Sequence, residues 1–185
     1  MKGLLSLTAG LASLTVPSAL SATSLSVGNE MTNACFEAAS IKRANDFAIS
    51  RCSLALRTEA STGGDRRVAT LVNRGILLML NEQSASATRD FDEAISIDPT
   101  ESEAWLGKAV EAWKAGDDRS AAGFANRALE LRTERPALAY FVRGLANEGM
   151  GNVRGAYSDL NTAQSLDPRW SEPAAQLARY KVIRR

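Results

Sequence analysis

The side chains that could do chemistry in this chain are two cysteines and several acidic and basic residues at recurring spacings. The 185 residues include no histidine, which excludes Ser-His-Asp and Cys-His catalysis and every zinc or haem site that needs a histidine ligand. Two cysteines alone cannot complete a four-thiolate metal site. Phosphate-loop, G-x-S-x-G and calcium-loop motifs are also missing. We therefore expect no catalytic residues, no metal and no cofactor, with a histidine-free hydrolase as the remote alternative.

Two arginines are each followed by an aspartate at the same spacing. Arg74 precedes Asp90 and Arg143 precedes Asp159, by 90 − 74 = 16 and 159 − 143 = 16 residues. The stretch between these pairs has Lys108 but no carboxylate at that spacing. The forked guanidinium group of arginine pairs with a carboxylate through two hydrogen bonds. We predict partly buried salt bridges with a structural role.

The charge balance excludes some classes of partner. Lys and Arg total 22, Asp and Glu total 21, and the formal net charge is +1. This balance provides no bulk attraction to nucleic acid or to an anionic membrane. Because 45% of the residues are apolar and 23% are charged, the chain can bury a core. We expect a globular protein that does not bind nucleic acid.

Residues 1–21 have the pattern of a secretory signal peptide. Lys2 precedes a mostly apolar run from Leu4 to Val16, and small residues follow around Ser21. A positive start, an apolar core of about 7–15 residues and a small-residue exit are typical of this signal. The run is shorter than the roughly 20 residues that cross a bilayer, and no other segment approaches that length. We predict cleavage near Ser21 and a soluble periplasmic protein with no integral membrane span.

The two cysteines have a structural use if the chain is exported. Disulfides form and persist in oxidising compartments. A bond between Cys35 and Cys52 closes a loop of 52 − 35 + 1 = 18 residues, which stabilises a fold by about 3 kcal/mol on loop-entropy grounds. A redox-active pair usually has the spacing C-x-x-C, which is missing here. We predict a structural disulfide.

Residues 68–170 contain one pattern three times, at 68–101, 102–135 and 137–170. In each unit, apolar residues recur at steps of three and four, which predicts helices. Turn-forming residues divide each unit into halves. Proline, in Pro99 and Pro168, cannot continue a helix and predicts where the second half ends. The expected helices cover 68–81, 84–97, 102–115, 118–131, 137–150 and 153–166.

Small and apolar residues occupy the same columns of all three units. The columns are Gly75, Ala109 and Gly144; Ala87, Ala121 and Ala156; Phe91, Ala125 and Leu160; Ala94, Ala128 and Ala163; and Pro99, Thr133 and Pro168. With Leu71, Trp105 and Tyr140 at the first aromatic position, this pattern resembles the tetratricopeptide repeat (TPR) family, whose unit has 34 residues. The resemblance implies an all-α, TPR-type solenoid of antiparallel helix pairs, in which stacked units share one core.

Atypical segments flank the three units. Residues 22–67 are predicted to form a degenerate N-terminal hairpin and a linker, because Ala48, Cys52 and Ala55 repeat the spacing of the second-helix columns. The resemblance brings Cys35 close to Cys52 within that hairpin, so that the disulfide holds together a short terminal unit. Residues 171–185 are predicted to form a capping helix, because repeat arrays need polar outer faces at their ends.

The resemblance also implies where a partner binds. The first helices of TPR units line a concave face on which peptides or partner helices dock, and the residues expected there are mostly apolar. We predict a non-catalytic interaction module, an adaptor or assembly factor, with a protein or peptide partner. The alternatives are that these residues pack within the array, or that a homo-oligomer buries the groove. The candidate residues are Val72, Ile76, Met79, Leu106, Val110, Trp113, Phe141, Leu145 and Glu148.

Overall fold

The computed structural model describes residues 20–58 and 64–180, and the regular elements in these two ranges are all α-helices. They are α1 (Leu20–Ser40), α2 (Asp46–Thr58), α3 (Gly64–Leu80), α4 (Ser84–Ile97), α5 (Ser102–Lys114), α6 (Asp118–Glu130), α7 (Pro136–Gly149), α8 (Val153–Leu166) and α9 (Ser171–Leu177). Within the same ranges, no helix combines the length and apolarity needed to cross a membrane.

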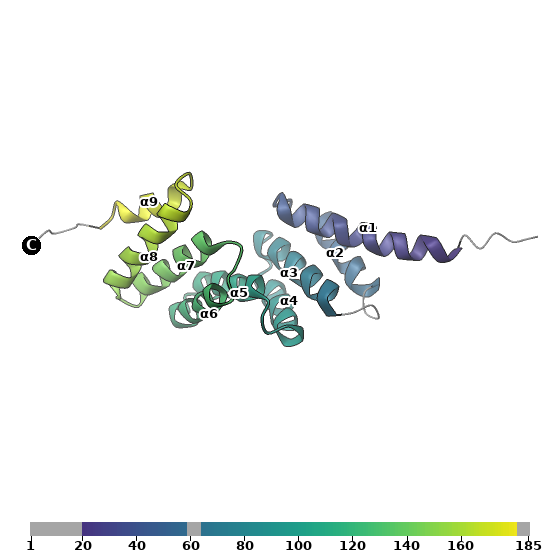
Figure 1. Ribbon diagram of the computed structural model, residues 1–185, viewed down its shortest axis with the longest axis horizontal. Coiled ribbons are helices and arrows are strands. Elements are labelled where there is room, and N and C mark those ends of the chain that lie inside the picture. The colour runs from purple at the N-terminus through teal and green to yellow at the C-terminus, as the bar shows by residue number, and fades with distance from the viewer. Residues whose placement is uncertain (1–19, 59–63, 181–185) are drawn as a thin grey trace, which may run out of the picture.

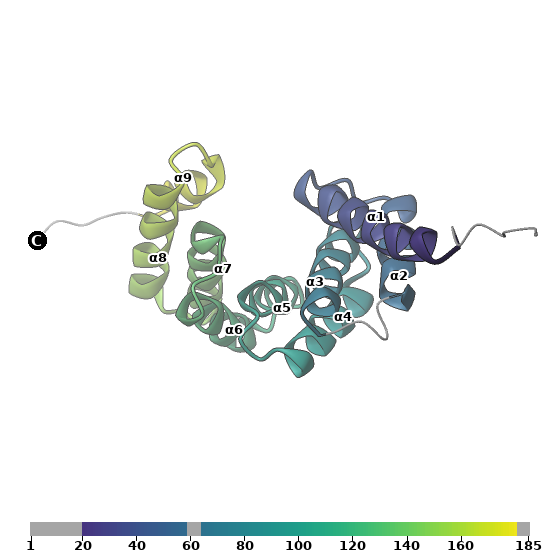
Figure 2. The same ribbon diagram turned by 45° about the vertical axis from the view of Figure 1, so that its right-hand side comes forward.

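Successive helices form antiparallel pairs that stack into a curved array (Figures 1 and 2). The pairs α3/α4, α5/α6 and α7/α8 are the three repeats, and α1/α2 forms a further hairpin at the N-terminal end. Helices α3, α5 and α7 pack against one another in turn, whereas the described parts of α4, α6 and α8 make no comparable contacts among themselves. The array therefore curves around the first helices, with α5 at the floor of its concave side (Figure 2).

Local sequence sets most of the helix ends. Helix α4 stops before Asp98-Pro99, where the Asp98 carboxylate accepts a hydrogen bond from the Thr100 backbone N–H at 2.8 Å. The hydrogen bond from the Thr100 hydroxyl, together with this backbone bond, holds the pKa of Asp98 below its ordinary value. The turns after α5 and α7 each contain a glycine with positive φ, 78° at Gly116 and 77° at Gly151. Glycine adopts this conformation without the steric cost that a side chain would bring.

The small-residue columns allow close approach inside each hairpin. Phe91 of α4 is fully buried, and a Cβ atom added to Gly75 of α3 would lie 2.6 Å from its ring. A Cβ atom on Gly107 of α5 would lie even closer to the same ring. The Phe91 ring is thus enclosed by glycines from two successive repeats, and the second of these glycines lies outside the predicted columns.

The N-terminal hairpin contains a disulfide bond between Cys35 of α1 and Cys52 of α2, with their Cα atoms 4.9 Å apart. Both cysteines are fully buried in a cluster that includes Leu77 of α3. Helix α1 also packs against α3, so the hairpin joins the array through both of its helices. The disulfide fixes α1 to α2 at the N-terminal end of the array.

Two predicted boundaries differ from the observed ones by more than one residue. Helix α3 begins at Gly64, ahead of the predicted start at 68, so the last residues of the predicted linker are helical. The C-terminal helix ends at Leu177, so it does not extend through the predicted range of 171–185. The predicted signal peptide, 1–21, lies almost entirely outside the described residues, as do positions 59–63 of the predicted linker.

Candidate functional site

The predicted concave surface divides into buried and accessible residues. Val72, Leu106 and Leu145 are 6%, 1% and 9% exposed. Val72 and Leu106 belong to core clusters that join one repeat to the next. The prediction that these three side chains present a binding surface is therefore wrong. The reason is that α3, α5 and α7 also pack against one another, and this contact covers part of their inner faces.

The other apolar candidates are more accessible. Ile76 and Met79 are partly buried against the core of the first repeat, and Val110 is partly buried against that of the second. Phe141 is partly buried and packs against Trp170, with ring centroids 4.7 Å apart. Each of these four side chains has one side fixed by the protein and another in contact with solvent.

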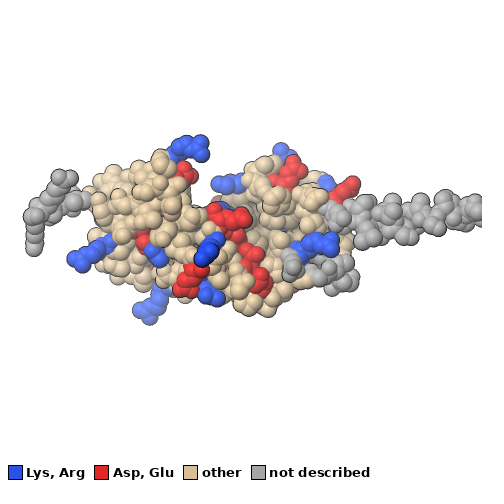
Figure 3. All heavy atoms as spheres, in the orientation of Figure 1, with Lys and Arg blue, Asp and Glu red and all other residues tan. Residues whose placement is uncertain are grey.

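Trp113 is the most accessible of the predicted residues, at 39% exposure. Leu80, which was not predicted, is 42% exposed and lies one turn beyond Ile76 on the same face of α3. Its four-residue spacing from Ile76 was the signal that could have identified it. The space-filling view shows the molecule hollowed between its two ends, with Asp and Glu side chains gathered beside the hollow (Figure 3).

Glu148 is engaged by the C-terminal segment. Its carboxylate forms an ion pair with Arg179 at 2.9 Å. Burial, reinforced by the nearby Glu148 carboxylate, raises the pKa of the Tyr180 hydroxyl. Glu148 therefore helps to hold the end of the chain against α7.

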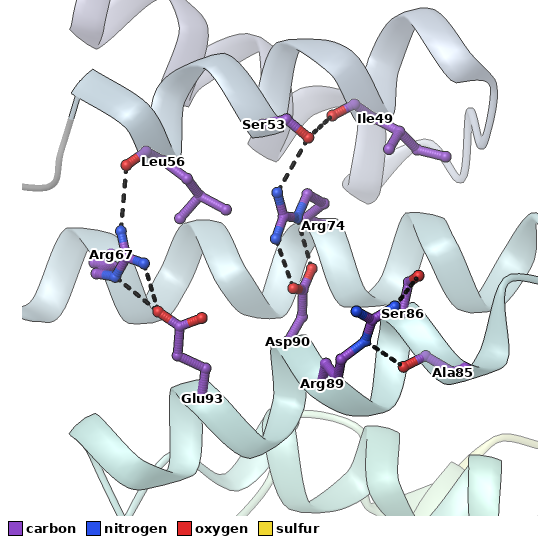
Figure 4. Close-up of polar contacts among 10 residues, drawn as sticks. All are labelled: Ile49, Ser53, Leu56, Arg67, Arg74, Ala85, Ser86, Arg89, Asp90 and Glu93. Atoms are coloured by element: carbon purple, nitrogen blue, oxygen red, sulfur yellow. Dashed lines mark hydrogen bonds and ion pairs between the residues drawn. The ribbon is translucent and has the colours of Figure 1, made fainter.

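The structure brings Arg74 and Asp90 together between α3 and α4. Arg74 Nε donates to Asp90 Oδ2 at 2.7 Å, and Nη2 donates to Oδ1 at 2.6 Å. Its third nitrogen, Nη1, donates to the Ser53 hydroxyl of α2 at 3.1 Å (Figure 4). Asp90 is only 4% exposed. The guanidinium group therefore links three helices, and both carboxylate oxygens of Asp90 accept hydrogen bonds.

Arg143 and Asp159 repeat this arrangement in α7 and α8. The two bonds measure 2.8 Å from Nε and 2.6 Å from Nη2, and they raise the pKa of Arg143. Arg143 Nη1 donates to Asn126 of α6 at 2.7 Å. Asn147 donates a further hydrogen bond to Asp159 at 3.0 Å. These donors satisfy the buried carboxylate and leave it no free oxygen for acid-base work.

A basic residue at the same position of each repeat contacts the preceding helix pair. Lys108 forms its ion pair with Asp92 of α4 and lies over the Phe124 ring of its own repeat, 4.7 Å from the centroid. Asp92 occupies the repeat column that Ser53 and Asn126 occupy in their own helix pairs. The sequence prediction paired Arg74 and Arg143 only within their repeats and gave Lys108 no partner. It missed this second contact, which joins repeats to one another.

Arg67 provides a parallel link near the start of α3. Its Nε donates to Glu93 of α4 at 3.0 Å, and its Nη1 donates to the Leu56 carbonyl of α2 at 3.2 Å (Figure 4). A cavity of about 380 Å³ beside these groups is lined by Arg74, Asp90 and Glu93 among others. Each of these charged groups already has a protein partner. Within 20–58 and 64–180 there is also no cluster of three or more His, Cys, Asp or Glu residues that could hold a metal ion.

No protein-family model and no curated protein matches the chain. Several solved structures resemble it. A structure of MamA from Desulfovibrio magneticus RS-1 superposes with a TM-score of 0.65 at 20% identity, covering 82% of this chain and 81% of that one. The Arabidopsis OM64 TPR domain superposes with a TM-score of 0.59 at 19% identity, covering 63% of this chain and 96% of that domain. This chain has the tetratricopeptide-repeat fold.

A further structure of MamA gives a TM-score of 0.61 at 22% identity, with 80% of each chain covered. At these identities the likeness concerns the arrangement of helices. In the TPR-type fold, α3, α5 and α7 are the first helices of their repeats, and the accessible apolar residues described above lie on these helices.

Proposed function

We propose that the protein is a non-catalytic interaction module that binds a peptide or helix of a partner protein on its concave face. The observation that carries the proposal is the partial exposure of Trp113 on α5, beside Val110 one helical turn before it. Aromatic side chains of this kind dominate the binding energy of many protein interfaces. The TPR-type fold, shared with a domain named for that repeat, supports the same proposal.

The chemistry of the face favours an apolar ligand segment. Ile76 and Leu80 of α3 and Phe141 of α7 extend the accessible surface to either side of Trp113. An amphipathic helix or a hydrophobic peptide buries such a strip by placing apolar side chains at regular intervals along it. The paired arginines play no part in this binding, because their hydrogen-bonding groups are engaged within the array.

We also propose that the protein works outside the cytoplasm, in the periplasm. The predicted signal peptide and the buried disulfide support this location, because structural disulfides persist mainly in oxidising compartments. A mature chain that begins near Ser21 retains both cysteines and all three repeats.

Affinity capture from cell-envelope extracts with matched variants tests the proposal. Trp113→Ala removes the accessible ring of the concave face, whereas Leu166→Ala removes a more accessible apolar side chain, 50% exposed, from α8. We expect a partner that the wild type and Leu166→Ala retain and that Trp113→Ala loses. Phe141→Ala should act in the same direction as Trp113→Ala. A partner retained equally by all four proteins would refute binding on the concave face.

Sedimentation velocity distinguishes this proposal from a homo-oligomer that buries the same face. The proposal predicts a monomer whose sedimentation coefficient does not change between wild type and Trp113→Ala. An oligomer that Trp113→Ala dissociates would assign the face to self-association.

A further inference from the structure

A second accessible surface lies at the N-terminal end of the array, apart from the concave face. Helix α1 packs chiefly against α2 and α3 among the described residues, so the outer side of the α1/α2 hairpin has no helix against it (Figure 1). The last turns of α1 and the first turns of α2 border a depression of about 270 Å³. We call this surface the N-terminal face. The depression is lined by Ala34, Glu37, Ala38, Ile41, Arg43, Asn45, Phe47, Ala48 and Arg51.

Two large apolar side chains on this face are open to solvent. Ile41, just past the end of α1, is 55% exposed, and Phe47, in the first turn of α2, is 67% exposed. A pair of exposed apolar side chains on one depression is typical of a contact site, whereas single ones scattered over a surface are common. Ala38 and Ala48 between them provide a floor of small, buried side chains.

The basic residues on this face form no ion pairs within the described part of the chain. Arg43 and Arg51 form no ion pair with any residue in 20–58 or 64–180, and neither does the adjacent Lys42. The one carboxylate that lines the depression belongs to Glu37. By contrast, Arg74 and Arg143 in the repeats each bind an aspartate. The N-terminal face therefore has an excess of positive charge beside exposed apolar groups.

Arg51 has a side-chain N–H group on this face that lacks a hydrogen-bond acceptor. Its Cζ lies 5.4 Å from the centroid of the Phe47 ring, and its Nε is buried without a hydrogen-bond acceptor. A buried N–H group without an acceptor is unfavourable, and an ionised donor gains most from a carboxylate. The Asn45 side chain is occupied in accepting from the Ala48 N–H at 2.8 Å. Arg51 Nε therefore has no acceptor among the described residues.

We propose that the N-terminal face binds a peptide segment of a partner protein in which a glutamate or aspartate stands next to an apolar side chain. The apolar side chain enters the depression between Ile41 and Phe47, and the carboxylate accepts hydrogen bonds from Arg51 and Arg43. Charge complementarity selects this ligand over a second copy stacked on the outer face of α8. The residues lining that face are Arg154 and neutral side chains, with no carboxylate among them.

Fluorescence anisotropy with defined probes tests this assignment. The probes are short fluorescein-labelled peptides in which leucine alternates with glutamate or with lysine. We expect the glutamate peptide to bind the wild type and the lysine peptide not to bind. Arg51→Gln should weaken binding about tenfold or more, because it removes a hydrogen bond between charged groups. Phe47→Ser should weaken binding as well, and its side chain is exposed enough that folding is unaffected.

Two control variants separate this surface from others. Arg154→Gln removes an exposed arginine from the far end of the array, and Leu166→Ala removes an exposed apolar side chain from the same end. Both should bind the glutamate peptide as the wild type does. Equal binding of both peptides, unchanged binding by Arg51→Gln, or no binding of the glutamate peptide would overturn the proposal.

Two further measurements test whether the N-terminal face binds a membrane or a second copy of the chain instead. Co-sedimentation with phosphatidylglycerol vesicles that depends on Arg51 would make the surface a membrane contact and overturn the proposal. A dimer in sedimentation velocity that Phe47→Ser dissociates would assign the surface to a second copy, with the same consequence. The proposal predicts neither of these results.

Discussion

Replacing Gly107 by alanine would place a methyl group in the space of the Phe91 ring. The ring is fully buried, and both Gly75 and Gly107 would bring an added Cβ within 3.0 Å of it. Forcing an extra methyl group into a packed core usually costs about 1–3 kcal/mol. Alanine in a helix returns about 0.5–1 kcal/mol relative to glycine. We therefore expect Gly107→Ala to destabilise the fold by about 1–2 kcal/mol.

The chain supplies its own controls for this substitution. An added Cβ at Gly123, in α6, meets nothing within 4 Å, so Gly123→Ala should stabilise the protein by about 0.5–1 kcal/mol. Gly144 is intermediate, because the residue opposite it is Leu160 and the nearest contact would be 3.1 Å. The three variants should therefore rank Gly123→Ala, Gly144→Ala, Gly107→Ala in decreasing stability.

Thermal unfolding followed by circular dichroism measures this order. For a chain of this size, 1 kcal/mol shifts Tm by about 2–4 °C, so Gly107→Ala should lower Tm by about 2–8 °C. A second test combines Gly107→Ala with Phe91→Leu, which shortens the side chain that causes the clash. In that background the cost of Gly107→Ala should largely disappear, which gives a measurable coupling energy. If Gly107→Ala raised Tm as much as Gly123→Ala, the close approach to Phe91 would be disproved.

Two other predictions concern buried polar groups. Asp90→Ala should lower the free energy of unfolding in urea by about 2–3 kcal/mol, because it leaves the mostly buried Arg74 without its carboxylate. The control Glu130→Ala breaks an exposed ion pair and should cost no more than about 0.5 kcal/mol. Equal losses in the two variants would contradict this account. The pKa of Tyr180 is raised above its ordinary value of 10.0, so the folded chain holds this phenol neutral where the unfolded chain ionises it. The stabilising contribution of Tyr180 is complete below the ordinary pKa of 10.0 and is lost as the pH rises through the raised pKa. Above about pH 10, the free energy of unfolding should therefore fall more steeply for wild type than for Tyr180→Phe. Parallel curves for the two proteins would show that Tyr180 is not responsible.

The positions of the helices follow from local sequence. The helix predicted over 84–97 is observed with the same bounds in α4, and the one predicted over 153–166 is observed in α8. Helix periodicity, turn glycines and Asp-Pro pairs act within a few residues of one another, so the sequence alone determines these ends. The pairing of helices follows from the same source, because a short connection between two helices makes them antiparallel neighbours.

Contacts between repeats could not be predicted in the same way. Val72 and Leu106 have the spacing of a free concave face, yet both are buried, because burial depends on how closely α3, α5 and α7 approach one another. The contact of Lys108 with Asp92 likewise depends on how one repeat is placed on the next. No local pattern encodes that placement.

The sequence by itself determined that this protein is an array of helix pairs with a disulfide-bonded N-terminal hairpin. The helix pairs follow from the periodicity of apolar residues, and the disulfide follows from the two cysteines. Only the tertiary structure decided which side chains remain accessible. Trp113 of α5 stays exposed, and Arg51 at the N-terminal end forms no ion pair with the described residues. The physical reason is that accessibility depends on neighbouring helices, whose approach is set by packing along the whole array.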